Sequence, residues 1–235
     1  MFSKYTLTCL FALLGPFLPL ASAADGPTAA EVVTRLVEGN KRYVTGAPTH
    51  PHQTITYRAS LAAGQKPFVT ILTCADSRVS PEMIFDLGLG DAFVCRVAGN
   101  VLDSAGLGTI EYAVEHLHTP LLIVLGHQKC GAVKAAVDGG HFDGHLAALV
   151  AKIAPAVAEA RNQPGDLMSN AVRANVQQTV KFLSVSEPAL TEHLQDGTLT
   201  ILGARYDLAT GAVELFPAVG AAVVGESSPA TPKTE

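Results

Sequence analysis

The chain has 235 residues, of which 48% are hydrophobic and 16% charged, and its formal net charge is −5 at pH 7. This length and apolar content suffice for one large hydrophobic core or two small ones. The acidic balance, with no basic run and no Lys/Arg stripe interleaved with aromatic side chains, argues against nucleic acid as a partner.

The first 23 residues have the order of a secretory signal peptide. Lys4 carries the only charge in this segment, an apolar run follows it, and small residues lead up to Ala23. An uncleaved membrane anchor is the alternative, but the run is about 16 residues long and contains two prolines, whereas a spanning helix needs about 20 apolar residues. We therefore expect residues 1–23 to be removed, the mature chain to be periplasmic, and no membrane contact to remain.

Cleavage would also remove Cys9 and leave an odd number of cysteines, namely Cys74, Cys95 and Cys130. An exported protein usually pairs its thiols in disulfides. Because three thiols cannot all be paired within one chain, and because a large core needs no disulfide, we expect a metal ion to protect at least two of them.

The elements expected in the mature chain begin with a helix over residues 28–44, where Thr28 and Glu31 form a capping-box pattern ahead of an apolar stripe. Apolar runs bounded by glycine and proline are typical of strands buried in a parallel sheet. Such runs lie at residues 67–73, 91–99 and 120–126. The intervening segments 80–88 and 105–118 suit crossover helices, so this half of the chain predicts an α/β fold.

The carboxy-terminal half continues with helices and ends with strands. A further helix is predicted over residues 131–140, and 144–185 is expected to be helical with a break at 162–166. Residues 198–216 indicate two strands around a turn. We expect one domain over 24–219, with a central, mainly parallel sheet flanked by helices, an amino-terminal helical arm and carboxy-terminal strands. The remaining residues, 220–235, form a polar tail predicted to be disordered.

Two of these strand ends carry residues that bind metals. In a parallel sheet the carboxyl ends of the strands share one edge, so Cys74 after the first run and His127 after the third are expected to meet there. Cys130 follows at the start of the next helix. Two thiolates and one imidazole make a zinc site with a fourth position left open. The alternative for each cysteine alone is a small buried apolar side chain.

Asp76 and Arg78 lie directly after the first proposed ligand. They could form a purely structural ion pair. A functional role is favoured because two thiolates cancel the charge of Zn²⁺, so the metal should acidify its water less strongly than a site with three neutral histidines. A nearby carboxylate that accepts the water's proton in a hydrogen bond would help to hold a reactive hydroxide. Arg78 would keep Asp76 ionised and turned away from the metal.

The sequence Cys74-Ala-Asp76-Ser-Arg78, followed by His127-x-x-Cys130-Gly, resembles the β-class carbonic anhydrases. The resemblance extends through "FVCRVAGNV", "GTIEYAVEHL" and "LLIVLGHQKCGAV" and covers roughly residues 28–216. It implies zinc-dependent, reversible hydration of carbon dioxide to bicarbonate and a proton, with one zinc ion per chain. It also implies a homodimer or homotetramer.

The resemblance further implies which residues contact the substrate: Gln65, Phe93, Ala98, Tyr112 and Gly131. The glutamine matches a hydrogen-bonding residue of the plant-like subgroup. Phe93, Ala98 and Tyr112 match an apolar pocket that is partly supplied across the dimer, and the Gly131 amide matches a backbone donor to bound substrate. The alternatives are a plain loop residue for Gln65 and ordinary core positions for the two aromatic residues.

One family feature is absent. The bicarbonate-gated subgroup has a tryptophan three residues before the first cysteine ligand, whereas this chain has Ile71 there and no tryptophan at all. The chain therefore resembles the plant-like, open-site subgroup. Arg96 and Tyr206 match two other residues of the gating pocket, and we expect them to make structural hydrogen bonds instead.

Two other functions are compatible with parts of this pattern. Hydrolysis of carbonyl sulfide or carbon disulfide would use the same ligands, because those molecules are linear and isoelectronic in valence with carbon dioxide. A zinc-binding or thiol-redox protein without turnover is the second alternative. Asp76, Arg78 and Gln65 argue against it, because such a protein has no need of them.

Overall fold

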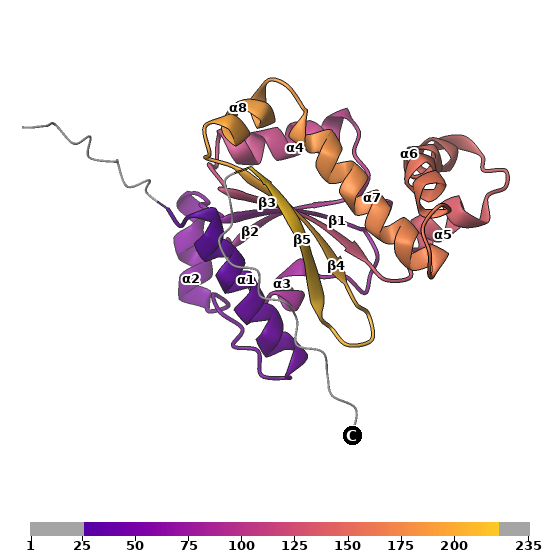
Figure 1. Ribbon diagram of the computed structural model, residues 1–235. Helices are drawn as coiled ribbons and strands as arrows, with labels where there is room; N and C mark the ends of the chain where they lie inside the picture. Colours follow the sequence, from indigo (N-terminus) through magenta and orange to yellow (C-terminus); the bar gives the residue numbers. More distant parts are fainter. Residues whose placement is uncertain (1–25, 221–235) are drawn as a thin grey trace, which may run out of the picture.

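The computed structural model describes residues 26–220 (Figure 1). The predicted cleavage site after Ala23 and almost all of the predicted tail lie outside this range. Among the described residues the strands are β1 (Val69–Thr73), β2 (Ala92–Arg96), β3 (Leu121–His127), β4 (Thr200–Tyr206) and β5 (Val213–Gly220). The α-helices are α1 (Ala29–Val44), α2 (Ile55–Ser60), α3 (Pro81–Ile84), α4 (Ser104–Glu115), α5 (Gly131–Asp138), α6 (Gly144–Ala160), α7 (Leu167–Ser184) and α8 (Ala189–Gln195). Two short 3₁₀ turns are η1 (Leu61–Ala63) and η2 (Ala98–Asn100).

The strands form one sheet in the order β2-β1-β3-β4-β5. The pairs β1–β2, β1–β3 and β3–β4 are parallel, and only β4–β5 is antiparallel. This confirms the predicted α/β fold with a mainly parallel sheet, an amino-terminal helix and carboxy-terminal strands. Parallel strands need crossover connections, and α3, α4 and the α5–α8 segment lie in those connections.

The central strands β1 and β3 are buried along their whole length, because their two faces supply two different cores. Ile71 of β1 packs in one core with Leu36 of α1, and the adjacent Leu72 packs in the other with Val176 of α7. Figure 1 shows α1 and α3 on one side of the sheet and α4, α7 and α8 on the other. This burial explains why the two strands read as continuous apolar runs rather than as alternating patterns.

Helix α1 begins as the sequence predicts. The Glu31 amide donates to Thr28 Oγ1 at 3.3 Å, and the Thr28 amide donates to Glu31 Oε2 at 2.8 Å, which completes the capping box. Near its other end, buried Asn40 donates to the Ile84 and Gly211 carbonyl oxygens and accepts from the Val213 amide. Asn40 thereby ties α1 to the end of α3 and to the start of β5.

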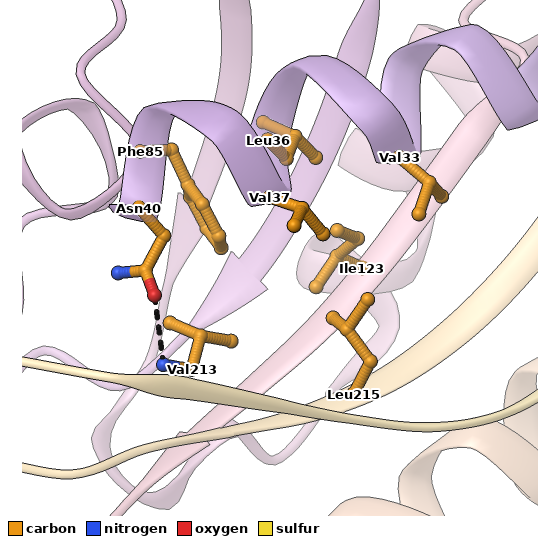
Figure 2. Close-up of a pocket in the computed structure, with 8 residues that line it drawn as sticks. All are labelled: Val33, Leu36, Val37, Asn40, Phe85, Ile123, Val213 and Leu215. Atoms are coloured by element: carbon orange, nitrogen blue, oxygen red, sulfur yellow. Dashed lines mark hydrogen bonds between the residues drawn. The ribbon is translucent and has the colours of Figure 1, made fainter. Parts of the chain in front are cut away.

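A small cavity of about 40 Å³ lies beside this asparagine (Figure 2). Apart from Asn40 its lining is apolar: Val33, Leu36, Val37, Phe85, Ile123, Val213 and Leu215. Both amide hydrogens of Asn40 are already used by backbone carbonyls. The cavity therefore presents no group that could do chemistry on a ligand.

Some elements differ from the predictions. Helix α3 is much shorter than the predicted 80–88 helix, because Asp86 takes a left-handed conformation (φ 48°) that ends it. Asp86 is held there by its carboxylate, which accepts hydrogen bonds from the amides of Thr49 and His50 and from Arg42 Nε. The short helices α2 and α8 were not predicted, and β5 runs further than 216. No helix within residues 26–220 is long and apolar enough to cross a membrane.

Candidate metal centre

The three predicted metal ligands meet at the carboxyl edge of the sheet. Cys74 directly follows β1, and His127 is the last residue of the neighbouring strand β3. Cys130 is the N-cap of α5, and Lys129 before it takes a left-handed conformation (φ 54°) that turns the chain back towards Cys74. All three ligand side chains belong to residues that are at most 4% exposed. The fold thus brings together two cysteines that lie 56 positions apart.

The ligand atoms of Cys74, His127 and Cys130 all lie within 4.8 Å of one another, and no other group of this kind occurs in the described part of the chain. The two Sγ atoms are 3.9 Å apart, and both cysteines are free thiols. Cys95 is also free, but it lies in β2 and does not belong to the group. The prediction that Cys95 is not a ligand is tested by the variants described in the Discussion.

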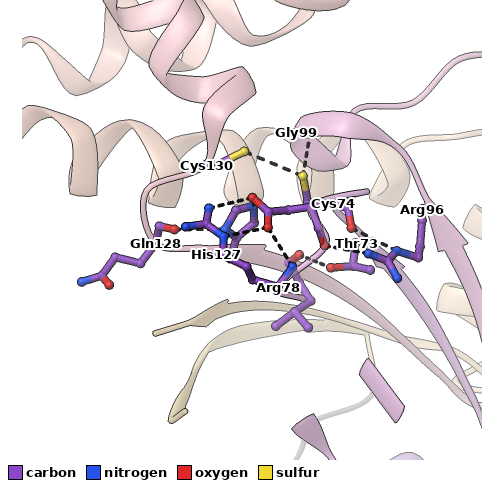
Figure 3. A network of polar contacts seen from close by, with 10 residues as sticks. Thr73, Cys74, Arg78, Arg96, Gly99, His127, Gln128 and Cys130 are labelled. Atoms are coloured by element: carbon purple, nitrogen blue, oxygen red, sulfur yellow. Dashed lines mark hydrogen bonds and ion pairs between the residues drawn. The ribbon is translucent and has the colours of Figure 1, made fainter. Parts of the chain in front are cut away.

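The histidine is oriented for metal binding. His127 Nδ1 lies 3.0 Å from the Gln128 carbonyl oxygen, which can only accept, so in the neutral imidazole Nδ1 is the donor and Nε2 is the nitrogen with the free lone pair (Figure 3). Nε2 is buried and has no hydrogen-bond partner within residues 26–220. A buried nitrogen lone pair beside two sulfur atoms is what a tetrahedral Cys₂His zinc site requires, so the residues fit that ion.

The environment of Cys74 favours its thiolate. The Gly99 amide donates to Cys74 Sγ at 3.2 Å, as Figure 3 shows. The hydrogen bond from Cys130 is the largest of several causes that hold the pKa of Cys74 below its ordinary value, while burial opposes them. Deprotonated sulfur is the form that binds metal.

The Asp76 carboxylate lies beside the ligands and is paired with Arg78. Arg78 Nε and Nη2 donate to its two oxygens at 2.9 and 2.8 Å, and the Arg78 amide adds a third hydrogen bond at 3.0 Å. Asp76 Oδ2 is 3.7 Å from His127 Nε2. The hydrogen bonds from Arg78 are the main reason that the pKa of Asp76 lies well below its usual range. Asp76 is therefore an ionised proton acceptor within reach of the metal position.

Arg96 holds the loop that carries Asp76 through two hydrogen bonds. Arg96 Nη2 donates to the Asp76 carbonyl oxygen at 2.7 Å, and Arg96 Nε donates to the Cys74 carbonyl oxygen at 3.3 Å. Tyr206 lies on β4, and its hydroxyl is 3.2 Å from that of Tyr43 on α1. Both residues thus make hydrogen bonds within the fold, as expected in the absence of the gating tryptophan, whose place is taken by fully buried Ile71.

The residues predicted to contact substrate fall into two groups. Ala98 precedes Gly99, whose amide contacts Cys74 Sγ, and Gly131 follows Cys130 as the first residue of α5, so both are adjacent in sequence to residues of the metal group. Phe93 lies three residues before Arg96 on β2, and its ring packs 6.0 Å from that of Tyr112 on α4. Gln65 lines a separate cavity of about 1000 Å³ at the amino ends of the strands. Within one chain, these last three residues do not face the metal group.

Two residues at the centre were not predicted, namely Gly99 and Asn175. Asn175 of α7 donates to the Gly99 carbonyl oxygen at 2.8 Å. The sequence signal for Asn175 was a polar residue between apolar positions on a helix that otherwise keeps a buried stripe.

A mainly parallel sheet that carries a Cys–His–Cys group at the ends of its central strands, with an Asp–Arg pair beside it, is the arrangement of a β-class carbonic anhydrase. The comparisons agree, and the chain belongs to this family. The family model for carbonic anhydrase matches residues 69–213. Carbonic anhydrase 2 of Mycobacterium tuberculosis is 46% identical over 189 residues, which cover 79% of this chain and 91% of the relative. The carbonic anhydrase of Mycolicibacterium smegmatis is 43% identical over 189 residues, with coverages of 79% and 92%.

Solved structures show the same likeness. The β-carbonic anhydrase CcaA superposes with a TM-score of 0.63 at 27% identity, over 80% of this chain and 88% of that one. The Coccomyxa β-carbonic anhydrase in complex with acetazolamide gives a TM-score of 0.63 at 27% identity, with coverages of 78% and 85%.

Proposed function

We propose that this chain is a zinc-dependent enzyme that reversibly hydrates carbon dioxide to bicarbonate and a proton. The observation that carries the proposal is the buried, unpartnered Nε2 of His127, which faces the sulfur atoms of Cys74 and Cys130. These three residues would hold one zinc ion per chain. When bound there, zinc supplies the Lewis acidity that makes water nucleophilic near neutral pH.

Asp76 acts as the proton acceptor of the reaction. Its carboxylate is ionised because Arg78 donates three hydrogen bonds to it, and it lies 3.7 Å from His127 Nε2. Arg78 also fixes the direction of the carboxylate, which keeps Asp76 from becoming a further metal ligand. Proton acceptance by a positioned carboxylate is ordinary general-base catalysis.

Gly131 and Ala98 provide the nearest substrate contacts. The Gly131 amide is at the first turn of α5, where amide groups have no partner within the helix and the helix dipole favours an anion. Bicarbonate is an anion of suitable size for such a donor. Ala98 adds a small apolar wall, which suits the uncharged carbon dioxide molecule.

The remaining substrate contacts come from a second copy of the chain. Gln65, Phe93 and Tyr112 do not face the metal group of their own chain, and Tyr112 is 45% exposed although it is aromatic. A homodimer or homotetramer in which these residues line the neighbour's pocket would account for both facts.

We also propose an open site and export to the periplasm. The Asp76–Arg78 pair and the isoleucine at position 71 favour a centre whose fourth metal position stays open to water. Export rests on the sequence of residues 1–23 alone.

The test uses the chain from Ala24 onward. We expect one zinc per chain by elemental analysis, carbon dioxide hydration in stopped-flow measurements, loss of this activity on chelation, and recovery with zinc. Full activity in a chain freed of metal would contradict the zinc dependence. A zinc-loaded chain that does not hydrate carbon dioxide would contradict the reaction itself.

A further inference from the structure

The turn η2 places a backbone amide against the metal group. Gly99 takes a left-handed conformation there (φ 68°, ψ 17°). A Cβ at this position would lie 2.8 Å from Ile153 Cδ1 and 3.1 Å from Ala132 Cβ, so a larger residue would have to displace Ile153 and would also be strained at this φ. The Gly99 amide donates to Cys74 Sγ at 3.2 Å. The turn thus supplies one hydrogen bond to the Cys74 sulfur. Gly99, which donates it, has the greatest backbone freedom of any residue type, so other contacts must hold it in this conformation.

The side chain of Asn175 fixes this glycine from across the core. Its Nδ2 donates to the Gly99 carbonyl oxygen at 2.8 Å, over a separation of 76 residues. Asn175 is 1% exposed and lies on α7 among the buried apolar residues Ala171, Val172 and Val176. The amide and carbonyl groups of Gly99 belong to the two peptide units that flank its Cα, so contacts to both fix its φ and ψ together.

The burial of Asn175 is unfavourable for the fold alone. Its Oδ1 is buried and has no hydrogen-bond partner within residues 26–220. A buried polar group that is only partly paired costs stability relative to an apolar side chain of similar size. Such a residue is expected where it serves a site rather than the core.

We propose that Asn175 is a positioning residue for the metal centre, which holds Gly99 in the conformation that donates a hydrogen bond to the Cys74 sulfur. The proposal rests on a metal ion being bound by Cys74, His127 and Cys130, as proposed above. A hydrogen bond to a thiolate withdraws negative charge from the sulfur. Cys74 then donates less charge to the metal, and the metal remains a stronger Lewis acid than two unmodified thiolates would leave it.

The test is Asn175→Leu, which keeps the approximate size of the side chain and removes the donor. Cobalt(II) in place of zinc reports on the sulfur through the thiolate-to-metal charge-transfer band. We expect this band to move to longer wavelength in Asn175→Leu, because a sulfur without its hydrogen bond gives up charge more easily. We also expect metal affinity in chelator competition to fall by about 10- to 100-fold, because Gly99 and Cys74 are then no longer held in place, and this loss of orientation outweighs the stronger charge donation of the sulfur.

Leu183→Ala is the matched control. Leu183 is fully buried on the same helix and belongs to the core cluster that does not contain Cys74. This variant loosens α7 without touching Gly99, so the band and the affinity should stay at the parent values. If Leu183→Ala shifts the band as far as Asn175→Leu does, Asn175 acts only through the stability of the fold and the proposal is wrong.

A second measurement is made first on the parent chain, where no substitution can disturb folding. With cadmium-113 in the site, the Gly99 amide proton should show scalar coupling to the metal through the Cys74 sulfur, and Asn175→Ala should lose it. Cadmium bound without coupling to Gly99 overturns the inference while leaving the proposed function intact. A parent chain that binds neither cobalt nor cadmium through its thiols contradicts the proposed metal site, on which the inference depends.

Discussion

Replacing Asp76 by asparagine tests the proton acceptor most directly. The Asp76 carboxylate accepts from Arg78 Nε at 2.9 Å, from Nη2 at 2.8 Å and from the amide at 3.0 Å. Asparagine has almost the same size, but its one oxygen can replace only one carboxylate oxygen, and its NH₂ group then faces an Arg78 N–H. More importantly, a neutral amide is a very poor proton acceptor. Because general-base catalysis contributes about 10²- to 10⁴-fold, kcat for hydration should fall by about that factor.

The loss should be independent of pH near neutrality. The hydrogen bonds from Arg78 depress the pKa of Asp76, so the folded-state pKa is below that of the unfolded chain. Ionised Asp76 therefore contributes its full share to the stability of the fold at any pH above its pKa in the unfolded chain, about 4. This contribution is lost only as the pH falls through the lower pKa of Asp76 in the folded chain. The parent carboxylate is therefore ionised throughout mild acid, and protonation of Asp76 cannot explain any change in activity between mild acid and alkali.

The assay is stopped-flow hydration of carbon dioxide, with zinc content measured on the same samples. Glu82→Gln is the matched control, because it makes the same change of charge at an exposed carboxylate that accepts a hydrogen bond from Ser80 Oγ. It should be as active as the parent. A fully active Asp76→Asn enzyme would remove Asp76 from the mechanism, and an Asp76→Asn enzyme without metal would show that Asp76 belongs to the ligand set.

Four further outcomes are expected. Cys130→Ser should lose the metal and Cys95→Ser should keep it, and the reverse pattern in elemental analysis would refute the ligand assignment. Chelation should lower the melting temperature by about 2–12 °C in a thermal scan, because without an ion the buried, unpaired His127 Nε2 lowers the folding stability by about 1–3 kcal/mol. An unchanged melting temperature would refute this. Activity should rise gradually with pH, with bicarbonate acting only as a product inhibitor; a steep, multi-proton loss on acidification with non-competitive inhibition by bicarbonate would contradict the open site. Amino-terminal sequencing of the periplasmic fraction should begin at or near Ala24, and intact Met1 in the cytosol would disprove export.

The sheet was predictable because its central strands are apolar on both faces. The runs at 67–73 and 120–126 have no polar face, and β1 and β3 are the strands that the two cores enclose. The shortening of α3 was not predictable in the same way. It depends on Asp86, whose carboxylate binds backbone amides at Thr49 and His50, and no local pattern reveals a contact over such a distance.

The meeting of Cys74, His127 and Cys130 was predictable because two strand ends carry the first two and strand ends of a parallel sheet converge. The contacts around the ligands were not. Asn175 reaches Gly99 across 76 residues, and nothing in the sequence near Gly99 indicates which helix covers it. The separation of Gln65, Phe93 and Tyr112 from the metal group was also hidden, because a motif match gives the positions of residues in a family but not the chain that they face.

The three residues of the metal group come from two parts of the chain that are far apart in sequence. His127 and Cys130 lie in one tight turn, so they are neighbours as soon as that turn exists, whereas Cys74 joins them only when β1 pairs with β3. If the group binds zinc as proposed, a chain without this pairing would offer only two ligands and would hold the ion weakly. Affinity would then rise as the central strands come together, and the bound ion would in turn stabilise their pairing. Zinc retention would thus distinguish correctly assembled chains from those in which the middle of the sheet is still open.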